Sequence, residues 1–504
     1  MAGKSYLVIR ADANTRIGTG HLMRCLALAQ AWRDSGGEVV FITACESPVL
    51  LQRLSDESFE AIQLDSPYPD PADLEATSQV LAAHPNAWAV LDGYHFDEAY
   101  QKQVKEASHR LLVIDDMAHL EHYYADIVLN QNLHAGQLNY PCEPYTQLLL
   151  GTRYVLLRRE FLQWQNWKRE IPQVARKVLV TLGGADLNNV TLKVIKAIHK
   201  LNVRDLEVKV VVGPSNPHIA SLKEAVDHSL FAIHLLPSVE SMPELMAWAD
   251  VAVSAGGSTC WELAFMGLPA VILVVADNQR NIAEQLASMK VAVNLGWHEN
   301  LSPVEITKAI TRLLIEPQVR AEMAQRSQHL VDGESGARVL MCLKDERLRL
   351  RQASEDDCRL FWEWANDPEV RAAAFSSDHI AWEVHEQWFA RKLYEPNCFL
   401  FVAVDDQDTP AGQVRFDVDE EREAEIDVSI DRVKRRLGYG SLLISMGVAE
   451  LFRITPMRTV HALIKLHNKA SIRAFEEAGF KKLAIETIRG NVTVHYIRNR
   501  SDEE

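Results

Sequence analysis

Several features are absent from this sequence, and each absence removes a class of protein. There is no run of about 18 apolar residues, so we expect no membrane span and no membrane partner. The start, MAGKSYLVIRADANT, lacks the apolar stretch of a signal peptide. The seven cysteines form no CxxC pair, which argues against disulfides or a zinc site and favours the cytoplasm. Positive charge is not in excess, because the formal net charge is −16, so we expect no nucleic-acid partner.

The composition is that of a globular protein with more than one domain. Hydrophobic residues make up 47% and charged residues 24% of the 504 positions. At roughly 100–200 residues per domain, this length predicts about three domains. The first half alternates helical patterns with short apolar runs such as YLVIRAD, EVVFIT, WAVLDGY and RLLVIDD. This alternation predicts βαβ units and therefore an α/β fold with parallel sheets.

Two breaks in this rhythm suggest where the domains end. One falls in LLLGTRYVLLRREFLQWQNWKREIPQ, after which strands and helices restart with KVLVTLGG; the other falls in ESGARVLMCLKDERLRLRQ. We predict domains at 1–155, 156–343 and 344–504. The first two read as Rossmann-like halves of a GT-B-like pair, with ligands bound beyond the carboxyl ends of the strands. The third reads as a smaller α/β domain.

The block RADANTRIGTGHLMRC contains the strongest pattern of the first half. Gly18 and Gly20 allow a tight turn from the first strand into a helix, and His21 lies at the helix start. Met23 stands where a dinucleotide site needs its third glycine, so we do not expect NAD. The positive helix end favours an uncharged imidazole, which can accept a proton from water. His21 is thus a candidate general base; the alternative is a structural histidine near the helix cap.

Two glycine turns in the second half predict an anion site. LGGAD (182–186) and SAGGSTCWELAFMGLP (254–269) each follow an apolar run and precede a helical pattern. Backbone N–H groups at such helix starts can hold a diphosphate. Glu262 would then bind two ribose hydroxyls, unless it is an ordinary surface acid. DNQRN (277–281) follows the next strand and would point at the same cleft.

Taken together, these blocks resemble the UDP-sugar hydrolases of pseudaminic acid biosynthesis over about residues 4–340. That family releases UDP from UDP-2,4-diacetamido-2,4,6-trideoxy-β-L-altropyranose with water, and its fold resembles the MurG-type glycosyltransferases. The resemblance implies that His21 is the base, that Glu262 binds ribose and that Arg158 of LLRREF helps to hold the nucleotide. The other UDP-sugar contacts that it implies are Gly18, Gly20, Tyr94, Asn132, Gly183, Gly184, Gly256, Gly257, Ser258 and Asn278.

A second chemistry is indicated near the C-terminus. In AEIDVSIDRVKRRLGYGSLL an alternating strand runs into a basic glycine loop and then an apolar helix, and Arg435, Gly438 and Gly440 match R-x-x-G-x-G. Such a loop can grip a pyrophosphate, although a solvated basic turn is the alternative. With HNKASIRAFEEAGF further on, residues 347–500 resemble the GNAT acetyltransferases. The resemblance implies acetyl-CoA as co-substrate, bound by Val428, Ile430, Arg435, Arg436, Gly438, Tyr439, Gly440, Ser441 and Asn468; no metal is expected.

The acid and base of acetyl transfer are less clear from the sequence. Many GNAT members carry a proton-donating tyrosine where this chain has Phe475, so Tyr496 or a water would donate instead, or the thiolate leaves unassisted. Glu425 is a candidate base acting through water, or else a solvent-facing strand residue. HEQWFARKL and LRLRQASEDD resemble the N-acetyltransferase of the same pathway. We therefore expect acetylation of the 4-amino group of a UDP-linked amino sugar, followed by release of UDP.

Four other functions fit parts of the sequence. The first unit could be a glycosyltransferase with an acceptor other than water, or a UDP-sugar 2-epimerase. The chain could also be a nucleotide-sugar sensor whose acetyltransferase modifies proteins, and the C-terminal domain alone could be a protein N-acetyltransferase. Product analysis separates these alternatives, because a hydrolase frees sugar without any acceptor.

Overall fold

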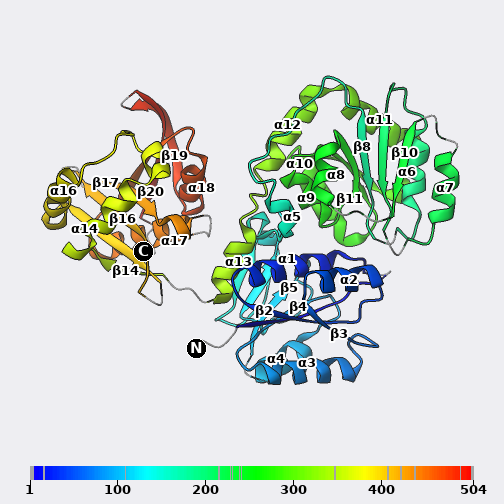
Figure 1. Cartoon of the computed structure of the whole chain (residues 1–504), viewed down its shortest axis with the longest axis horizontal. Coiled ribbons are helices and arrows are strands. Elements are labelled where there is room, and N and C mark those ends of the chain that lie inside the picture. Colours follow the sequence, from blue (N-terminus) through cyan, green and yellow to red (C-terminus); the bar gives the residue numbers. More distant parts are fainter. Residues whose placement is uncertain are drawn as a thin grey trace. The chain divides into compact units, whose positions relative to one another are not determined.

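The computed structural model places the chain in two compact units, Met1–Leu340 and Met341–Glu504, which are described separately (Figure 1). The division falls inside helix α13, Ser335–Lys344. The structure describes residues 5–14, 17–107, 109–184, 186–213, 216–227, 229, 231–237, 239, 241–344, 348–405, 408–419, 423–435, 439–488 and 490–500.

The first half of unit 1 is a parallel sheet in the order β3-β2-β1-β4-β5-β6-β7. Its central strands are buried apolar runs, as expected where helices cover both faces. Helices α1 and α2 lie on one side of it and α3 and α4 on the other (Figure 1). The strands are β1 Tyr6–Ala11, β2 Glu38–Thr43, β3 Glu60–Gln63, β4 Trp88–Asp92, β5 Arg110–Ile114, β6 Ile127–Asn130 and β7 Gln147–Leu150. The helices are α1 Gly20–Asp34, α2 Pro48–Asp56, α3 Pro71–Ala83, α4 Glu98–Glu106 and α5 Arg159–Leu162.

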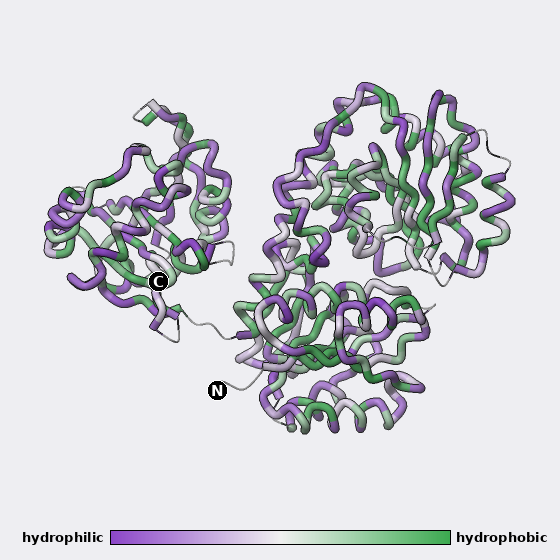
Figure 2. Tube along the Cα trace, viewed as in Figure 1, coloured by the Kyte–Doolittle hydropathy of each residue, from purple (hydrophilic) through white to green (hydrophobic). Residues whose placement is uncertain are grey.

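The second half of unit 1 repeats the plan with the strand order β10-β9-β8-β11-β12-β13. Alternate residues of β8 enter different cores: Val178 and Val180 pack in the one that contains α6 and α11, and Leu179 in the one that contains α8 and α9. Figure 2 shows the apolar strands between more polar helices. The strands are β8 Lys177–Thr181, β9 Glu207–Val211, β10 Ala232–Leu236, β11 Val251–Ala255, β12 Ala270–Val274 and β13 Ala292–Trp297. The helices are α6 Val190–Ile198, α7 Ile219–Asp227, α8 Met242–Trp248, α9 Thr259–Phe265, α10 Arg280–Ser288, α11 Pro303–Ile315 and α12 Pro317–Gln328.

After the second half, the chain returns to the first. A Cβ on Gly336 of α13 would lie 3.3 Å from the Ala31 side chain of α1, so the two helices pack closely. Arg338 secures this return, because it pairs with Asp332 at 2.6 Å and donates to the Arg153 carbonyl at 3.0 Å. The parallel sheets and this return confirm the α/β fold class with a GT-B-like pair.

Unit 2 is built on a mixed sheet in the order β14-β15-β16-β17-β18-β20-β19. Strands β17 and β18 are parallel, but they pair only at Ala424 with Val460 and at Glu425 with His461 before they separate. The strands are β14 Arg349–Gln352, β15 Cys398–Val404, β16 Pro410–Val418, β17 Ala424–Ile430, β18 Thr459–Lys465, β19 Lys481–Ile488 and β20 Asn491–Asn499. The helices are α14 Cys358–Ala365, α15 Pro368–Ala373, α16 Trp382–Tyr394, α17 Tyr439–Ile454 and α18 Lys469–Glu477.

Candidate active sites

The glycine turn before α1 presents His21 as predicted at the start of this helix. Gly18 has φ +77°, a conformation that glycine adopts without strain, and α1 begins at Gly20. His21 is buried with 7% of its surface exposed. Its Nδ1 lies 2.6 Å from Oδ1 of Asp92, the last residue of β4. The imidazole therefore contacts a carboxylate.

The charge on Asp92 determines which nitrogen of His21 can act. Burial alone would raise the pKa of this carboxyl, but the Arg24 guanidinium and His21 hold the pKa well below its ordinary value. Arg24 donates to both oxygens, at 2.6 and 2.7 Å. An ionised carboxylate can only accept, so Nδ1 of His21 carries a hydrogen. In the neutral ring the lone pair is consequently on Nε2, as a general base requires.

A second carboxylate, Asp116, lies in a hydrogen-bond network with Tyr94, Asn132 and Asn278, three of the UDP-sugar contacts that the resemblance implies. It accepts hydrogen bonds from Tyr94 Oη at 3.1 Å and from Asn132 Nδ2 at 2.7 Å. Asn278 of the second half donates to Tyr94 Oη at 3.4 Å. Arg24 pairs with Asp116 at 2.6 Å, so one guanidinium bridges both aspartates. Tyr94 also places its ring edge-on to His21, with centroids 5.0 Å apart.

The glycine turns of the second half lie against the turn that carries His21. A Cβ on Gly20 would lie 3.3 Å from Ser258 Oγ, and one on Gly184 would lie 2.8 Å from the Thr19 side chain. Gly183 has φ +96°, so this turn also needs glycine. The structure thus brings the predicted glycine turns of both halves together.

The two glycine turns of the second half differ in the backbone N–H groups that they can offer to an anion. Asp186 of LGGAD accepts the N–H groups of Val190 and Thr191, so the start of α6 is already capped by the protein. Ser258 precedes α9 and its side chain makes no capping hydrogen bond. The N–H of Gly256 is donated to Gln279 at 3.2 Å, which leaves Gly257 and Ser258 as the better donors of that turn.

The two residues predicted to hold the nucleoside are bonded to each other. Arg158 donates to Glu262 at 2.8 Å, and its other terminal nitrogen donates to Glu160 at 2.8 Å. Glu262 lies in the first turn of α9, four residues after Ser258. The side chains of Arg158 and Glu262 retain 13% and 17% exposure, so the pair lines a partly open surface.

In unit 2, the residues expected to bind acetyl-CoA differ in their surroundings. Arg435 pairs with Asp367 at 2.7 Å and with Glu369 at 3.3 Å, while its buried Nη2 has no hydrogen-bond partner among the described residues. Gly440 lies beside α18, where a Cβ would make an ordinary contact with Ala474 at 3.6 Å. Asn468 caps α18 by accepting from the Ser471 N–H. Val428 and Ile430 pack against the core, Tyr439 and Ser441 are buried, and Arg436 and Gly438 lie outside the described residues.

The candidate acid and base of acetyl transfer lie on different sides of the sheet. Tyr496 is buried beside Phe475 in the core, and its hydroxyl donates to Glu476 at 2.6 Å. Burial, and then the Glu476 carboxylate, raise the pKa of Tyr496, so it stays protonated. Glu425 is exposed at the position where the ladder between β17 and β18 ends.

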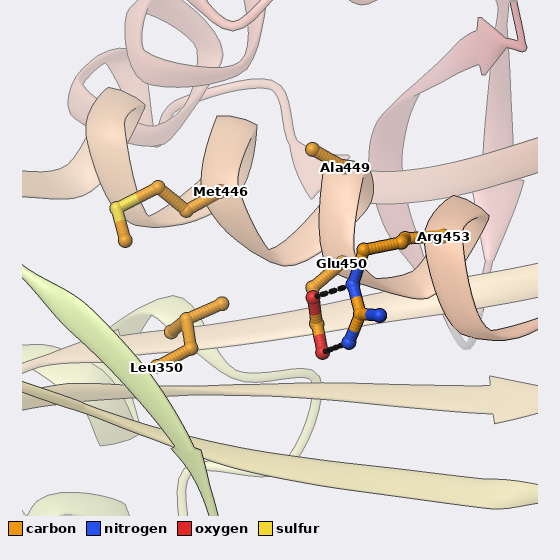
Figure 3. Close-up of a pocket in the computed structure, with 5 residues that line it drawn as sticks. All are labelled: Leu350, Met446, Ala449, Glu450 and Arg453. Atoms are coloured by element: carbon orange, nitrogen blue, oxygen red, sulfur yellow. Dashed lines mark hydrogen bonds and ion pairs between the residues drawn. The ribbon is translucent and has the colours of Figure 1, made fainter.

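Unit 2 also contains a cavity of about 350 Å³ that is lined by none of these residues (Figure 3). Leu350 of β14 and Met446 of α17 form its apolar part, and the ion pair of Glu450 with Arg453 lies at its edge (Figure 3). Because β14 is an edge strand and three strands away from β17 in the sheet order, this cavity is separate from the point where β17 and β18 stop pairing.

Neither a metal centre nor a membrane span is visible in the part of the chain that the structure describes. Among these residues, no group of three or more His, Cys, Asp or Glu side chains could hold a metal ion. Within the same ranges, no helix has the length and apolar character needed to cross a bilayer.

Comparison with protein families defines both parts of the chain. Residues 177–337 match the glycosyltransferase family 28 C-terminal domain, and residues 347–481 match the acetyltransferase (GNAT) domain. Each of the two compact units therefore contains a match to one of these domain families.

Individual relatives extend this result. An uncharacterised protein of Methanocaldococcus jannaschii is 22% identical and covers 94% of this chain and 96% of its own length. The UDP-2,4-diacetamido-2,4,6-trideoxy-beta-L-altropyranose hydrolase of Campylobacter jejuni is 25% identical over 56% of this chain and 96% of that protein. The crystal structure of Acinetobacter baumannii MurG aligns with 68% of this chain and 100% of its own, at 16% identity and a TM-score of 0.47. The predicted resemblance to the hydrolases and to the GNAT family is thus confirmed.

Proposed function

We propose that unit 1 hydrolyses UDP-2,4-diacetamido-2,4,6-trideoxy-β-L-altropyranose to UDP and the free sugar. The similarity to the Campylobacter hydrolase supports this substrate. The observation that carries the proposal is the buried pair of His21 with Asp92, next to the glycine turn at Ser258. This arrangement combines a base for water with a helix start for a diphosphate.

The reaction follows from these parts. Nε2 of His21 takes a proton from water while the water oxygen attacks the anomeric carbon. The bond from that carbon to the diphosphate oxygen breaks with inversion, and its electron pair leaves on UDP. The N–H groups of Gly257 and Ser258 would stabilise the charge that develops on the diphosphate. Glu262, still partnered by Arg158, would accept the ribose hydroxyls.

The test uses the UDP-sugar alone, without an acceptor. We expect release of UDP and free sugar, and a loss of about 10²–10⁴-fold in kcat for His21→Ala, because general-base assistance is worth that much. Binding of UDP to this variant should stay near the wild-type value. Near-native turnover of His21→Ala would contradict the assignment of the base, and release that needs an acceptor would indicate a glycosyltransferase.

We further propose that unit 2 transfers acetyl from acetyl-CoA to the 4-amino group of the precursor UDP-sugar. Beyond Glu425 and His461 the backbones of β17 and β18 no longer pair with each other and could bind an extended acyl chain, and Tyr496 of β20, the strand next to β18, would be the proton donor. The match to the GNAT domain supports acetyl-CoA as the co-substrate. An assay that compares the 4-amino UDP-sugar with peptides tests the acceptor, and preference for peptides would favour a protein acetyltransferase.

Under this proposal the two units catalyse consecutive steps. Acetylation yields the diacetamido sugar that unit 1 then hydrolyses, and fusion raises the local concentration of the intermediate.

A further inference from the structure

Two histidines contact each other on the face of the unit 2 sheet opposite α17. His461 in β18 and His495 in β20 occupy diagonal positions of an antiparallel ladder. Nδ1 of His461 lies 2.8 Å from Nε2 of His495. The residues before and after His461, Val460 and Ala462, belong to the apolar core, so both imidazoles are on the other face.

A carboxylate lies at each end of this pair. Nε2 of His461 is 3.0 Å from Glu423, yet it is a buried nitrogen without a directed hydrogen bond. Nδ1 of His495 is 3.0 Å from Glu486, which is 45% exposed. Each neutral imidazole carries one N–H, and one of these must fill the contact between the rings. One outer nitrogen of the pair therefore keeps a lone pair that can take up a proton.

The pair lies where the pairing of β17 with β18 ends. His461 is the residue of β18 opposite Glu425, where the ladder between β17 and β18 ends. Glu425 and Asp427 are exposed on the same face, and Arg415 of β16 lies 3.9 Å from Asp427. The charged groups on this face are Glu423, Glu425 and Asp427 from β17 and its lead-in, Glu486 from β19, Arg415 of β16, and Lys465 of β18, which donates to the Ala372 carbonyl. The carboxylates outnumber the cations, so this face suits a protonated amine.

We propose that His461 and His495 together are the proton acceptor for the amine substrate of acetyl transfer, an inference that rests on the proposed function of unit 2. The ammonium gives one proton to the pair. The free amine then forms its bond to the acetyl carbon as the carbon–sulfur bond breaks. The electron pair leaves on sulfur, Tyr496 gives its proton to the thiolate, and the second nitrogen proton then restores Tyr496. One proton per turnover reaches solvent past Glu486.

The experiment measures thiol release by the full chain from acetyl-CoA between pH 6.5 and 9.5. The acceptors are the 4-amino UDP-sugar and, separately, a small primary amine at high concentration. His461→Asn and His495→Asn are compared with His329→Asn, which changes an exposed histidine of unit 1. We expect each of the first two variants to lose about 10²-fold in kcat at neutral pH. The loss should shrink at pH 9.5, where the amine deprotonates without help, and KM for acetyl-CoA should stay within about twofold.

The outcomes separate this inference from the proposed function. Because the rings act as a unit, the double variant should lose little more than either single variant. Equal activity of wild type and variants at neutral pH, or a loss that is the same at every pH, would overturn the inference. If only the small amine is acetylated, the proposed substrate is wrong. The role of the two histidines is then tested by the kcat values of the variants with that amine.

Discussion

Replacing Asp92 with asparagine probes the orientation of His21 without shortening any side chain. Oδ1 of Asp92 accepts hydrogen bonds from His21 Nδ1 and from Arg24 Nη2, and Oδ2 accepts one from Arg24 Nε at 2.6 Å. In Asp92→Asn, one of these positions becomes an NH₂ group. If it faces His21, Nδ1 must accept a hydrogen bond and Nε2 becomes protonated, so the base is lost. If it faces Arg24, two donors oppose each other in a buried site.

The size of the expected effect follows from this geometry. Loss of the correct tautomer removes general-base assistance, so kcat for UDP release should fall by about 10²–10⁴-fold. Affinity for UDP should change by less than about threefold, because Asp92 lies on the strand of the first half and not at the Ser258 turn. Arg24 retains Asp116, so the destabilisation should stay below the roughly 3–5 kcal/mol of a fully broken buried pair.

The pH dependence of stability provides a second measure of the same variant. The pKa of Asp92 is lowered in the folded chain, so its ionised form stabilises the fold above the ordinary carboxyl pKa of about 4. This contribution is lost as the pH falls towards the folded-state pKa. Chemical denaturation of wild type and Asp92→Asn should therefore give a difference in free energy of unfolding that shrinks below about pH 4.

The matched control is Asp126→Asn, which removes the carboxylate that pairs with Lys105 at 2.7 Å in the same half. It should keep turnover. If Asp92→Asn kept more than about a third of wild-type kcat with an intact fold, or if Asp126→Asn were equally impaired, the reasoning about the tautomer would be refuted.

Three further changes follow from the structure. Asp116→Asn should lower kcat/KM by about tenfold or more in UDP release, because Arg24 and Tyr94 lose a common charged acceptor; unchanged kinetics would show that this carboxylate is dispensable. Gly213→Ala should lower Tm and hydrolysis, because its Cβ would overlap the Gly184 carbonyl, whereas Gly136→Ala, with open space around it, should be neutral; equal melting curves would argue against the close approach. Tyr496→Phe should reduce acetyl transfer by about tenfold or more while CoA binding, measured by calorimetry, persists; full activity would assign the proton to water.

Local features of the sequence predicted the scaffold of the first site well. Glycines before a helical pattern predicted the turn at Gly18 and the start of α1 beside His21, and the structure has both. Such turns depend on backbone conformation, which neighbouring residues determine. The alternation of helical patterns with short apolar runs likewise predicted the parallel sheets, because strands that are covered on both faces are apolar along their length.

The partners of His21 could not be predicted, because they depend on strand order. Asp92 is 71 residues away and approaches only because β4 pairs with β1. The acidic ends of WAVLDGY and RLLVIDD were the available signal, since carboxyl ends of parallel strands share one edge of a sheet. The same limit applies to Arg435, whose partners Asp367 and Glu369 come from an earlier helix and its cap. Asp186 was grouped with an anion site, although it caps α6 itself.

The most direct test of the account is incubation of the full chain with the 4-amino UDP-sugar and acetyl-CoA, following thiol and UDP release together. The account predicts that thiol release precedes UDP release, and that omission of acetyl-CoA suppresses most UDP release. UDP release that is equally fast without acetyl-CoA, or thiol release without any UDP, would contradict it.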